Sequence, residues 1–425
     1  MSSVISAGRA RADRSRSPHA RRRHHSFGFW VATLAFLVNM GFSAVPTPLY
    51  VLYQRRDHFS TIMVTVIYAA YAIGVIASLF FGGHVSDWVG RKRVLVPALL
   101  VSAVSGLIFL FEPSLPGLLV ARIVCGVSVG LTTATATAYL GELHLGTTAG
   151  MKGSPQWAQT VATAANLGGI GVGPLVAGLL AQYAPQPLRL PYIVFVTALL
   201  ILAALIALSP ETTDMPDPAP RYRPQRVAVP RHARRMFFAA TAVAAFAVYG
   251  VFNSLAPSFL AGTLHEDSHA LAGAVAFGAF ASGAVAQISL SRATLQRTLS
   301  TGPLLLIPGL ALLTAGMWLP DLTMFVVGGV LSGAGGGLAF RGALTAAGAT
   351  ARPESRAEVL AGFFLGAYVG LSVPVVGLGV ASRYVSPRVV MLVFVVLVAA
   401  AVLLCTRLVA AEHTRRTAEA GVSRG

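Results

Sequence analysis

Long apolar segments recur along this chain, and they limit its fold more than any other feature. Runs of about 18 or more mostly apolar residues follow one another between residues 29 and 408, and each could cross a hydrocarbon core of about 30 Å as a helix. Only 11% of the residues are charged, which is too few to cover a soluble protein of this length. The apolar positions do not alternate with period two, so a β-barrel is not expected. The sequence therefore predicts an all-α membrane protein.

Twelve transmembrane helices are expected. Their approximate limits are residues 29–52, 60–83, 94–112, 117–141, 156–183, 191–209, 236–261, 270–290, 301–319, 322–348, 358–383 and 388–408. If the chain crosses the membrane at each of them, the segments on the side of the amino terminus hold 25 of the 32 Lys and Arg residues. The positive-inside rule then places both termini in the cytoplasm, and we expect a multi-pass protein of the plasma membrane. Because the net charge of +17 lies mainly in these tails and loops, a nucleic-acid partner is not expected.

A proline- and arginine-rich segment divides the chain into two halves, because its composition cannot pack a core. The expected organisation is a disordered basic cytoplasmic tail at 1–28, a six-helix bundle at 29–209, a cytoplasmic linker at 210–235, a second six-helix bundle at 236–411 and a tail at 412–425. A transit peptide is the alternative for the Arg- and Ser-rich amino terminus.

The two halves carry matching features in the same order. Gly41 and Pro48 of the first span correspond to Gly250 and Pro257 of the seventh span at one constant offset. Such a parallel repeat is one way in which transporters are built. Prolines at these positions are expected to interrupt the first and seventh helices, as in discontinuous substrate-binding helices.

A charged, glycine-rich loop separates the second and third spans. Residues 82–95 read GGHVSDWVGRKRVL, in which Gly83, Asp87, Gly90 and Arg91 stand at the spacing G-x-x-x-D-x-x-G-R. This loop resembles the signature loop of the major facilitator superfamily. Two further segments support the resemblance: RIVCGVSVG at 122–130 is similar to the motif of the fourth span, and GGIGVGPLVAG at 168–178 is similar to the antiporter motif of the fifth span. The tripeptide PET at 210–212 resembles the usual end of the sixth span.

The resemblance implies a fold of two pseudo-symmetric six-helix bundles and roles for several residues. Asp87 and Arg91 would form a latch that faces the start of the eleventh span near Glu358, and Glu142 would pair with arginines of the loop. The antiporter-like motif implies export of a substrate in exchange for protons. Its matching residues are Gly169, Gly173, Pro174 and Gly178.

In the fold that the resemblance implies, spans one, four, seven and ten line a central cavity. The candidate substrate or coupling residues on them are Asn39, Arg122, Thr133, Tyr249, Asn253 and Arg341. An arginine within a membrane span costs several kcal/mol unless it faces a cavity or a partner, so Arg122 is the strongest candidate. Arg341 lies 12 residues beyond the repeat position of Arg122, about 18 Å along the helix, and is expected at a gate or snorkelling to the cytoplasmic face.

No Asp, Glu or His lies deep within an expected span, which conflicts with simple proton antiport. On the antiporter-like motif we expect an exporter of small organic molecules; an importer or exchanger of an organic anion, indicated by Arg122 and the lack of a buried acid, is the alternative, and a non-transporting sensor is a further one. Cys125 and Cys405 are far apart in sequence and predict neither a disulfide nor a metal site. An enzyme is not expected, and neither is a cofactor. The expected partners are a small-molecule substrate, the lipid bilayer and protons, and the protein is expected to be a monomer.

Overall fold

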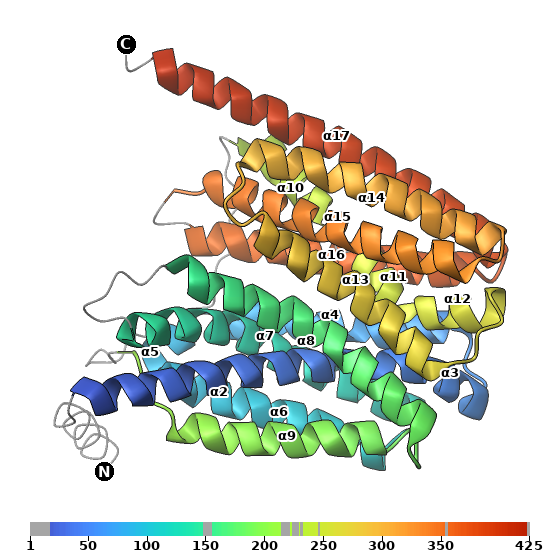
Figure 1. Ribbon diagram of the computed structural model, residues 1–425, viewed down its shortest axis with the longest axis horizontal. Coiled ribbons are helices and arrows are strands. Elements are labelled where there is room, and N and C mark those ends of the chain that lie inside the picture. The colour runs from blue at the N-terminus through green and yellow to red at the C-terminus, as the bar shows by residue number, and fades with distance from the viewer. Residues whose placement is uncertain are drawn as a thin grey trace.

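The protein is a bundle of helices that run along its long axis (Figure 1). The computed structural model describes residues 18–147, 155–213, 222, 229, 233–244, 247–352 and 356–422. Within these ranges the chain forms helices, turns and bends but no strand. Eleven helical segments of this part of the chain are long and apolar enough to cross a membrane. The predicted all-α membrane fold is confirmed.

The helices form two groups that correspond to the two halves of the chain (Figure 1). The first group comprises α2 (Pro18–Ala44), α3 (Pro46–Asp57), α4 (Thr61–Gly82), α5 (Ser86–Val89), α6 (Arg91–Phe111), α7 (Leu115–Thr147), α8 (Pro155–Tyr183) and α9 (Leu190–Leu208). The second comprises α10 (Arg234–Ala244), α11 (Ala247–Ser254), α12 (Ala256–Thr263), α13 (His269–Ser289), α14 (Leu295–Trp318), α15 (Leu322–Ala349), α16 (Arg356–Ala381) and α17 (Pro387–Val422).

The twelve expected spans correspond to these helices, and two of the spans are broken. The first span is α2 followed by α3, and the seventh is α10, α11 and α12, which have 11, 8 and 8 residues. Residues 245–246, between α10 and α11, lie outside the described residues, and for this reason the seventh span is not counted among the eleven long segments.

Proline explains the break at the same place in each half. Val45 separates α2 from α3, which begins at Pro46, and Leu255 separates α11 from α12, in which Pro257 is the second residue. Proline has no N–H to donate and its ring clashes with the preceding turn, so a helix tends to restart there. The predicted interruption of the first and seventh helices is confirmed.

The helices extend into both expected tails. Of the amino-terminal tail at 1–28, residues 1–17 lie outside the described residues, but α2 already begins at Pro18. Its first turns are held against the ends of other helices, because Arg22 donates to the carbonyl oxygen of Thr147 at 3.0 Å. At the other terminus, α17 continues to Val422, through a stretch rich in Ala, Glu and Arg, which are good helix formers.

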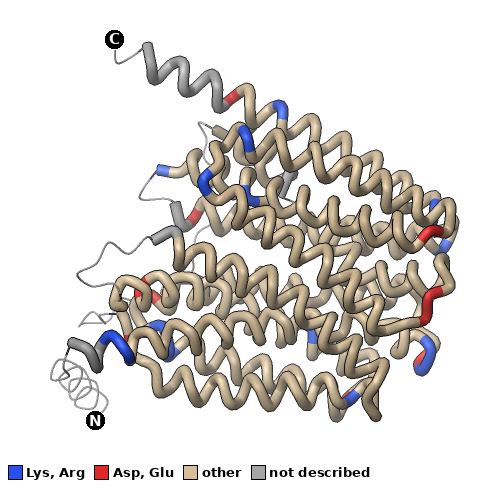
Figure 2. The backbone as a smooth tube through the Cα atoms, in the orientation of Figure 1, with Lys and Arg blue, Asp and Glu red and all other residues tan. Residues whose placement is uncertain are grey.

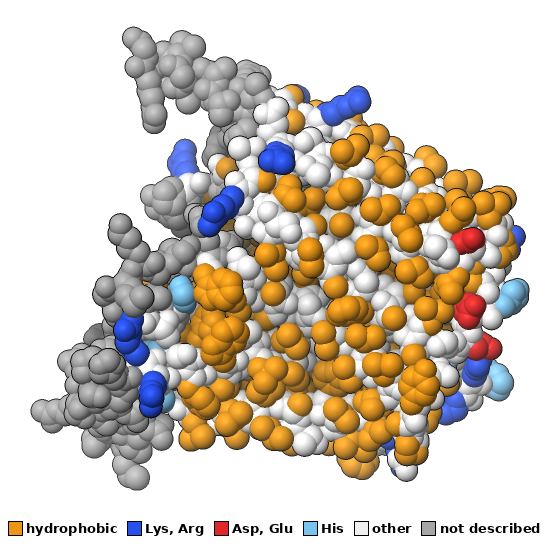
Figure 3. Space-filling view, viewed as in Figure 1, with side chains coloured by type: hydrophobic (Ala, Val, Ile, Leu, Met, Phe, Trp, Pro, Cys, Tyr) orange, Lys and Arg blue, Asp and Glu red, His pale blue; other side chains and the backbone are white. Residues whose placement is uncertain are grey.

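Charged residues gather at the two ends of the helices and leave a wide apolar belt between them (Figure 2). We call the end at which Pro18 and Val422 lie the termini end, and the other end the opposite end. The belt is covered with exposed apolar side chains (Figure 3). Leu304 of α14 and Leu397 of α17, for example, are 71% and 64% exposed. Such a belt is suited to contact with lipid, since hydrocarbon does not penalise apolar surface.

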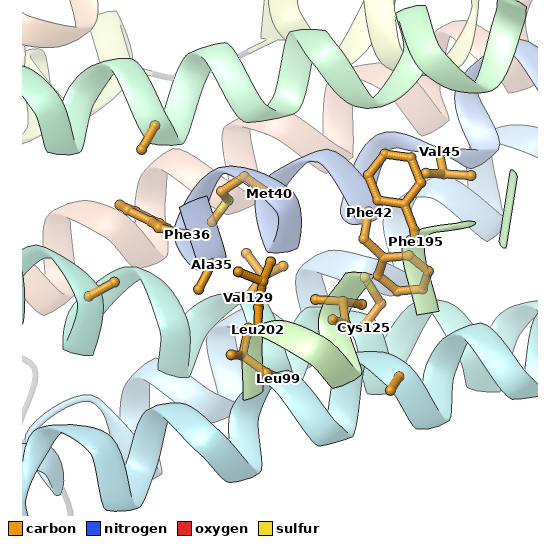
Figure 4. Packing of buried hydrophobic residues seen from close by; sticks show 14 of the residues in the cluster. Ala35, Phe36, Met40, Phe42, Val45, Leu99, Cys125, Val129, Phe195 and Leu202 are labelled. Atoms are coloured by element: carbon orange, nitrogen blue, oxygen red, sulfur yellow. The ribbon is translucent and has the colours of Figure 1, made fainter. Parts of the chain in front are cut away.

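The core of the first bundle is formed where α2 packs against α6, α7 and α9 (Figure 4). Phe42 of α2 lies 6.4 Å from Phe195 of α9 between ring centroids, and both are buried. Cys125 of α7 is 1% exposed in this core, and it is a free cysteine, as is Cys405. The expectation that neither cysteine takes part in a disulfide agrees with this packing.

The most extensive contacts between the halves are made by two pairs of helices: α8 with α13 and α4 with α16. Glycines at the contact between α8 and α13 allow these two helices to approach each other closely. A Cβ atom on Gly273 would lie 2.2 Å from the carbonyl oxygen of Pro174, and one on Gly178 would lie 2.3 Å from that of His269. Small residues let two backbones come this close, which favours helix association within a membrane.

Candidate substrate cavity

A cavity of about 240 Å³ lies between the two bundles. Its walls come from both halves and include α2, α3, α4, α7 and α8 as well as α11, α13, α15 and α16. Aromatic side chains form much of the wall: Tyr50, Tyr68, Tyr71, Tyr249, Phe280, Phe340, Phe364 and Tyr368. Among the described residues that line the cavity, Arg122 is the one with a charged side chain.

Four of the six predicted substrate residues lie at this cavity: Arg122, Thr133, Tyr249 and Asn253. Two of them are engaged by the backbone, since Thr133 donates to the carbonyl oxygen of Val129 at 2.7 Å and Tyr249 to that of Gly333 at 2.7 Å. Their polar groups therefore shape the wall and are only partly free for a ligand.

Asn39 and Arg341 do not line this cavity, and for Arg341 this agrees with the expected position near the end of its span. Asn39 is fully buried where α2 packs on α7, and its Oδ1 accepts a hydrogen bond from Ser128 at 3.3 Å. Arg341 donates to the carbonyl oxygens of Gln287 and Ser291 at the termini end of α13. Both are absent from the lining because a membrane helix turns only part of its circumference toward the cavity.

The opposite end of the cavity is closed by contacts between the halves. Thr47 of α3 donates to the backbone oxygen of Asn253 at 3.0 Å and to its side-chain oxygen at 3.2 Å. Farther out, Ser258 donates to Gln54 at 3.1 Å, and Arg55 pairs with Asp267. The contact therefore forms where proline interrupts both repeated helices.

Toward the termini end the cavity reaches residues that are exposed. Thr137 of α7 and Gln159 of α8 line it, and both side chains are accessible from outside. Gln159 is about one helical turn from Pro155, where α8 begins at that end. The cavity is thus open toward the termini end and closed at the opposite one.

The charged loop at residues 82–95 forms a network within the first bundle. Arg91 pairs with Asp87 one helical turn away and with Glu142 of α7, whose Oε1 lies 2.7 Å from Nη2. Gly83 caps the end of α4, and its backbone N–H donates to the carbonyl oxygen of Leu79 at 3.3 Å. Gly90 has φ of +113°, which glycine adopts without strain.

The predicted contact of this loop with the eleventh span is not made between the described residues. Asp87 is 62% exposed, and no hydrogen bond or ion pair joins it to Glu358 or to the rest of α16 in the described ranges, which omit 353–355. The cavity reaches exposed residues at this end, so a closed latch between the halves is not expected in this conformation. The predicted latch of Asp87 and Arg91 against the start of the eleventh span would form only in a conformation that is closed at the termini end, and it stays a prediction.

Glu211 is a member of the network to which the sequence analysis assigned no role. Its carboxylate accepts hydrogen bonds from the backbone N–H groups of Arg91, at 2.8 Å, and Lys92, at 3.3 Å. These are the first two residues of α6, whose N–H groups have no partner within the helix. A negative charge there also interacts favourably with the helix dipole. The signal in the sequence was the tripeptide PET at 210–212.

Replacing Glu211 with alanine is expected to lower stability by about 1 kcal/mol, because it removes a cap and a favourable charge from α6. Glu211→Gln retains one acceptor oxygen and should cost less. Thermal unfolding of the purified protein would measure both. An unchanged unfolding temperature in Glu211→Ala would contradict the capping role.

The antiporter-like motif of α8 serves two different contacts. A Cβ atom on Gly173 would lie 2.0 Å from the carbonyl oxygen of Gly41, and one on Gly169 would lie 2.4 Å from that of Leu37, so both glycines pack α8 on α2. Pro174 and Gly178 instead meet α13 of the other half. One motif thus packs the first bundle and joins the two bundles.

These features define a class of protein: a helical membrane protein with two repeated bundles around a central cavity. The family model of the Major Facilitator Superfamily matches residues 30–320, and the chain belongs to this superfamily. A curated relative, an uncharacterised MFS-type transporter of Methanocaldococcus jannaschii, is 26% identical over 181 residues, which are 43% of this chain and 44% of the relative. The match thus spans less than half the length of that relative.

Solved structures of two transporters have the same fold. The human organic anion transporter MFSD10 (TETRAN) superposes with a TM-score of 0.64 at 16% identity, over 91% of this chain and 99% of that chain. The nucleoside transporter NupG superposes with a TM-score of 0.68 at 13% identity, over the same 91% and 99%. At such identities the likeness shows the fold alone.

Spans two, five, eight and eleven contribute lining residues that the sequence analysis missed. They include Tyr68 and Tyr71 of α4, Gln159 and Asn166 of α8, Phe280 and Gln287 of α13, and Tyr368 of α16. The only signal for them was the presence of polar or aromatic side chains within long apolar runs. Their orientation toward the cavity depends on how the bundles pack.

Proposed function

We propose that this protein is a secondary transporter that exports a small organic molecule by alternating access. The observation that carries the proposal is the cavity between the repeated bundles, which is sealed at the opposite end and reaches exposed residues at the termini end. Alternating access requires a site that opens to one side at a time, commonly by rocking one repeat against the other.

The distribution of charge supports an orientation. The tails and loops that the sequence assigns to the side of the amino terminus hold most of the Lys and Arg residues, which favours a cytoplasmic location for the termini end in a plasma membrane. In this orientation the cavity faces the cytoplasm, from which an exporter takes its substrate.

The antiporter-like motif supports export over import. Pro174 and Gly178 lie at the contact of α8 with α13, near the sealed end, where opening must separate the halves. No acidic residue lines the cavity in the described ranges, so coupling to protons would not take place within the cavity itself. A proton would have to act through an acid at the membrane face, and Asp87 and Glu142 of the Arg91 network are the candidates.

A second candidate is an importer or exchanger of an organic anion, and the buried charge of Arg122 favours it. An importer and an exporter could use the same cavity, and they would differ only in the direction of net transport. Direction is therefore the quantity that decides between the two.

Transport into everted membrane vesicles would test export directly. Labelled acids, amides and amines would be offered while a dye follows the pH of the lumen. Export predicts that at least one compound accumulates in vesicles with this protein, and proton antiport predicts that the lumen loses protons at the same time. Arg122→Ala should abolish accumulation, whereas Arg297→Gln, a change at an exposed residue outside the cavity, should retain it. Uptake by intact cells without accumulation in everted vesicles would favour import, and silence in both assays would favour a non-transporting sensor.

A further inference from the structure

The charge of Arg122 is buried and only partly compensated. Its side chain is 2% exposed, and Nη1 donates to the carbonyl oxygen of Ser43 at 2.6 Å. The guanidinium carbon lies 4.6 Å from the ring centroid of Tyr71 and 5.6 Å from that of Tyr68. Such cation–π contacts contribute roughly 0.5–2 kcal/mol each, less than the cost of burying a charge. Among the described residues Nε has no hydrogen-bond partner.

This positive charge cannot be removed by loss of a proton, because arginine stays protonated in proteins. No Asp or Glu lines the cavity in the described part of the chain, so its walls provide no counter-charge. Arg122 lines the cavity, and its Nε is a donor that the described residues leave unmatched, so the charge calls for an acceptor that the protein itself does not supply. The natural acceptor for a guanidinium is a carboxylate, which can take two parallel hydrogen bonds.

The rest of the cavity is suited to a flat apolar group. Tyr249 and Phe280 stack with ring centroids 4.6 Å apart, and Tyr71 meets Tyr368 edge-on at 6.4 Å. These four rings come from both bundles, and they line the cavity together. Aromatic rings pack well on other aromatic rings, by offset stacking or by edge-to-face contact.

We propose that the cavity binds a small aromatic monocarboxylate, with its carboxylate on the guanidinium of Arg122 and its ring among the aromatic side chains. One uncompensated positive charge selects a single negative charge on the ligand. The volume of about 240 Å³ selects a molecule with one or two rings. The inference rests on the proposed function, since it assigns a chemical class to the substrate of the same cavity.

Three probes with the same ring and different charge would test this: benzoate, benzamide and benzylamine. Binding of each to the purified full-length protein in lipid nanodiscs at pH 7 would be measured by calorimetry. Charge-assisted hydrogen bonds favour the acid, so benzoate is expected to bind at least about tenfold more tightly than benzamide, and benzylamine most weakly. Equal or tighter binding of benzamide or benzylamine by the unaltered protein would overturn the proposal without any variant.

Two variants locate the site. Arg122→Gln removes the charge and keeps a donor, so the preference for benzoate over benzamide should disappear while binding of benzamide is retained. Arg297→Gln removes a positive charge at an exposed residue and should leave the preference unchanged. A preference for benzoate that persists in Arg122→Gln would place the anion elsewhere. Should Arg122→Gln not fold, Arg122→Lys, which keeps the charge but loses the planar fork, should weaken benzoate binding alone.

The binding assay separates this inference from the proposed function. Binding of benzoate at Arg122 without transport of any acid would leave the site in place and contradict export. Export of amines or neutral compounds, with no preference for benzoate, would leave export in place and overturn the anion site.

Discussion

Alanine at Gly126 is expected to prevent the first bundle from folding to its native packing. A Cβ atom there would lie 2.1 Å from the carbonyl oxygen of Tyr71 and 2.9 Å from the backbone nitrogen of Val75, both in α4. Gly74 of α4 faces Gly126 in turn, and its own Cβ would lie 2.0 Å from the carbonyl oxygen of Ile123. Because these neighbours are backbone atoms of a packed helix, they cannot move aside singly, and α4 and α7 must separate. We expect a loss of about 3 kcal/mol or more.

The same helix offers a matched control. Gly141 of α7 would place a Cβ atom with nothing within 4 Å, so Gly141→Ala meets no obstacle. Alanine favours the helix over glycine by up to about 1 kcal/mol, and the control should be neutral or slightly stabilised. The yield of folded protein and its thermal unfolding in detergent would be compared for the two variants. Equal unfolding temperatures would show that the close approach of α4 and α7 is not required.

The variant Gly126→Ala is also expected to lose ligand binding. Tyr71 lies on α4 and Arg122 on α7, and the ring and the guanidinium meet across this glycine contact. Separation of the two helices would move both away from the cavity wall. If the Gly126→Ala protein, once refolded or stabilised, bound ligand as the unaltered protein does, ligand binding would not depend on the close contact of α4 with α7.

Alanine at Gly273 is expected to open the sealed end of the protein. Its Cβ atom would lie 2.2 Å from the carbonyl oxygen of Pro174 and 3.1 Å from the Cα atom of Leu175. The clash lies between the two halves, so each bundle can keep its own packing while α8 and α13 move apart. We expect the conformation closed at the opposite end to be depleted and the rate of transport to fall at least about tenfold, because a carrier that cannot close one side does not complete its cycle.

Spin labels at the opposite end would report the change. Tyr183 at the end of α8 and Tyr384 after α16 are 79% and 81% exposed and lie on different halves, so cysteines there can be labelled once Cys125 and Cys405 are replaced. Gly273→Ala should lengthen the distance between the labels. Gly278→Ala in the same helix is the control, since its Cβ atom would meet a movable side-chain carbon of Val330 at 3.3 Å. If Gly273→Ala and Gly278→Ala gave the same distribution of distances between the two labels, the glycine contact of α8 with α13 would not be what keeps the opposite end closed.

Several features of the site could be predicted because they depend on local chemistry. The prolines at 46, 48 and 257 remove backbone donors wherever the chain goes, so the broken helices followed from the sequence. Arg122 was predicted at a cavity because a lone cation within a span is too costly against lipid, and it does line one. Thr133, Tyr249 and Asn253, chosen from the family resemblance of their spans, also line the cavity, and their role in substrate binding stays a prediction.

Other features could not be predicted, and the reason is the same in each case. In a soluble protein a polar face tells which side of a helix is turned outward, but here lipid and core are both apolar. The sequence therefore left open the rotation of each helix about its axis. Asn39 was assigned to the cavity and is packed on Ser128 instead, whereas Tyr68 and Tyr71 were overlooked and line it.

The sequence by itself determined the helices, their breaks, the division into two halves and the family to which the chain belongs. The lengths of apolar runs, the prolines and the spacing of charged and small residues are sufficient for these, because each acts over a few turns of chain. Only the tertiary structure decided which end of the cavity is sealed, that Glu211 caps α6, and that Arg122 lies close to two tyrosines in a cavity whose described lining residues include no acid. Those features depend on contacts between segments distant in sequence, which helix packing across two bundles brings together.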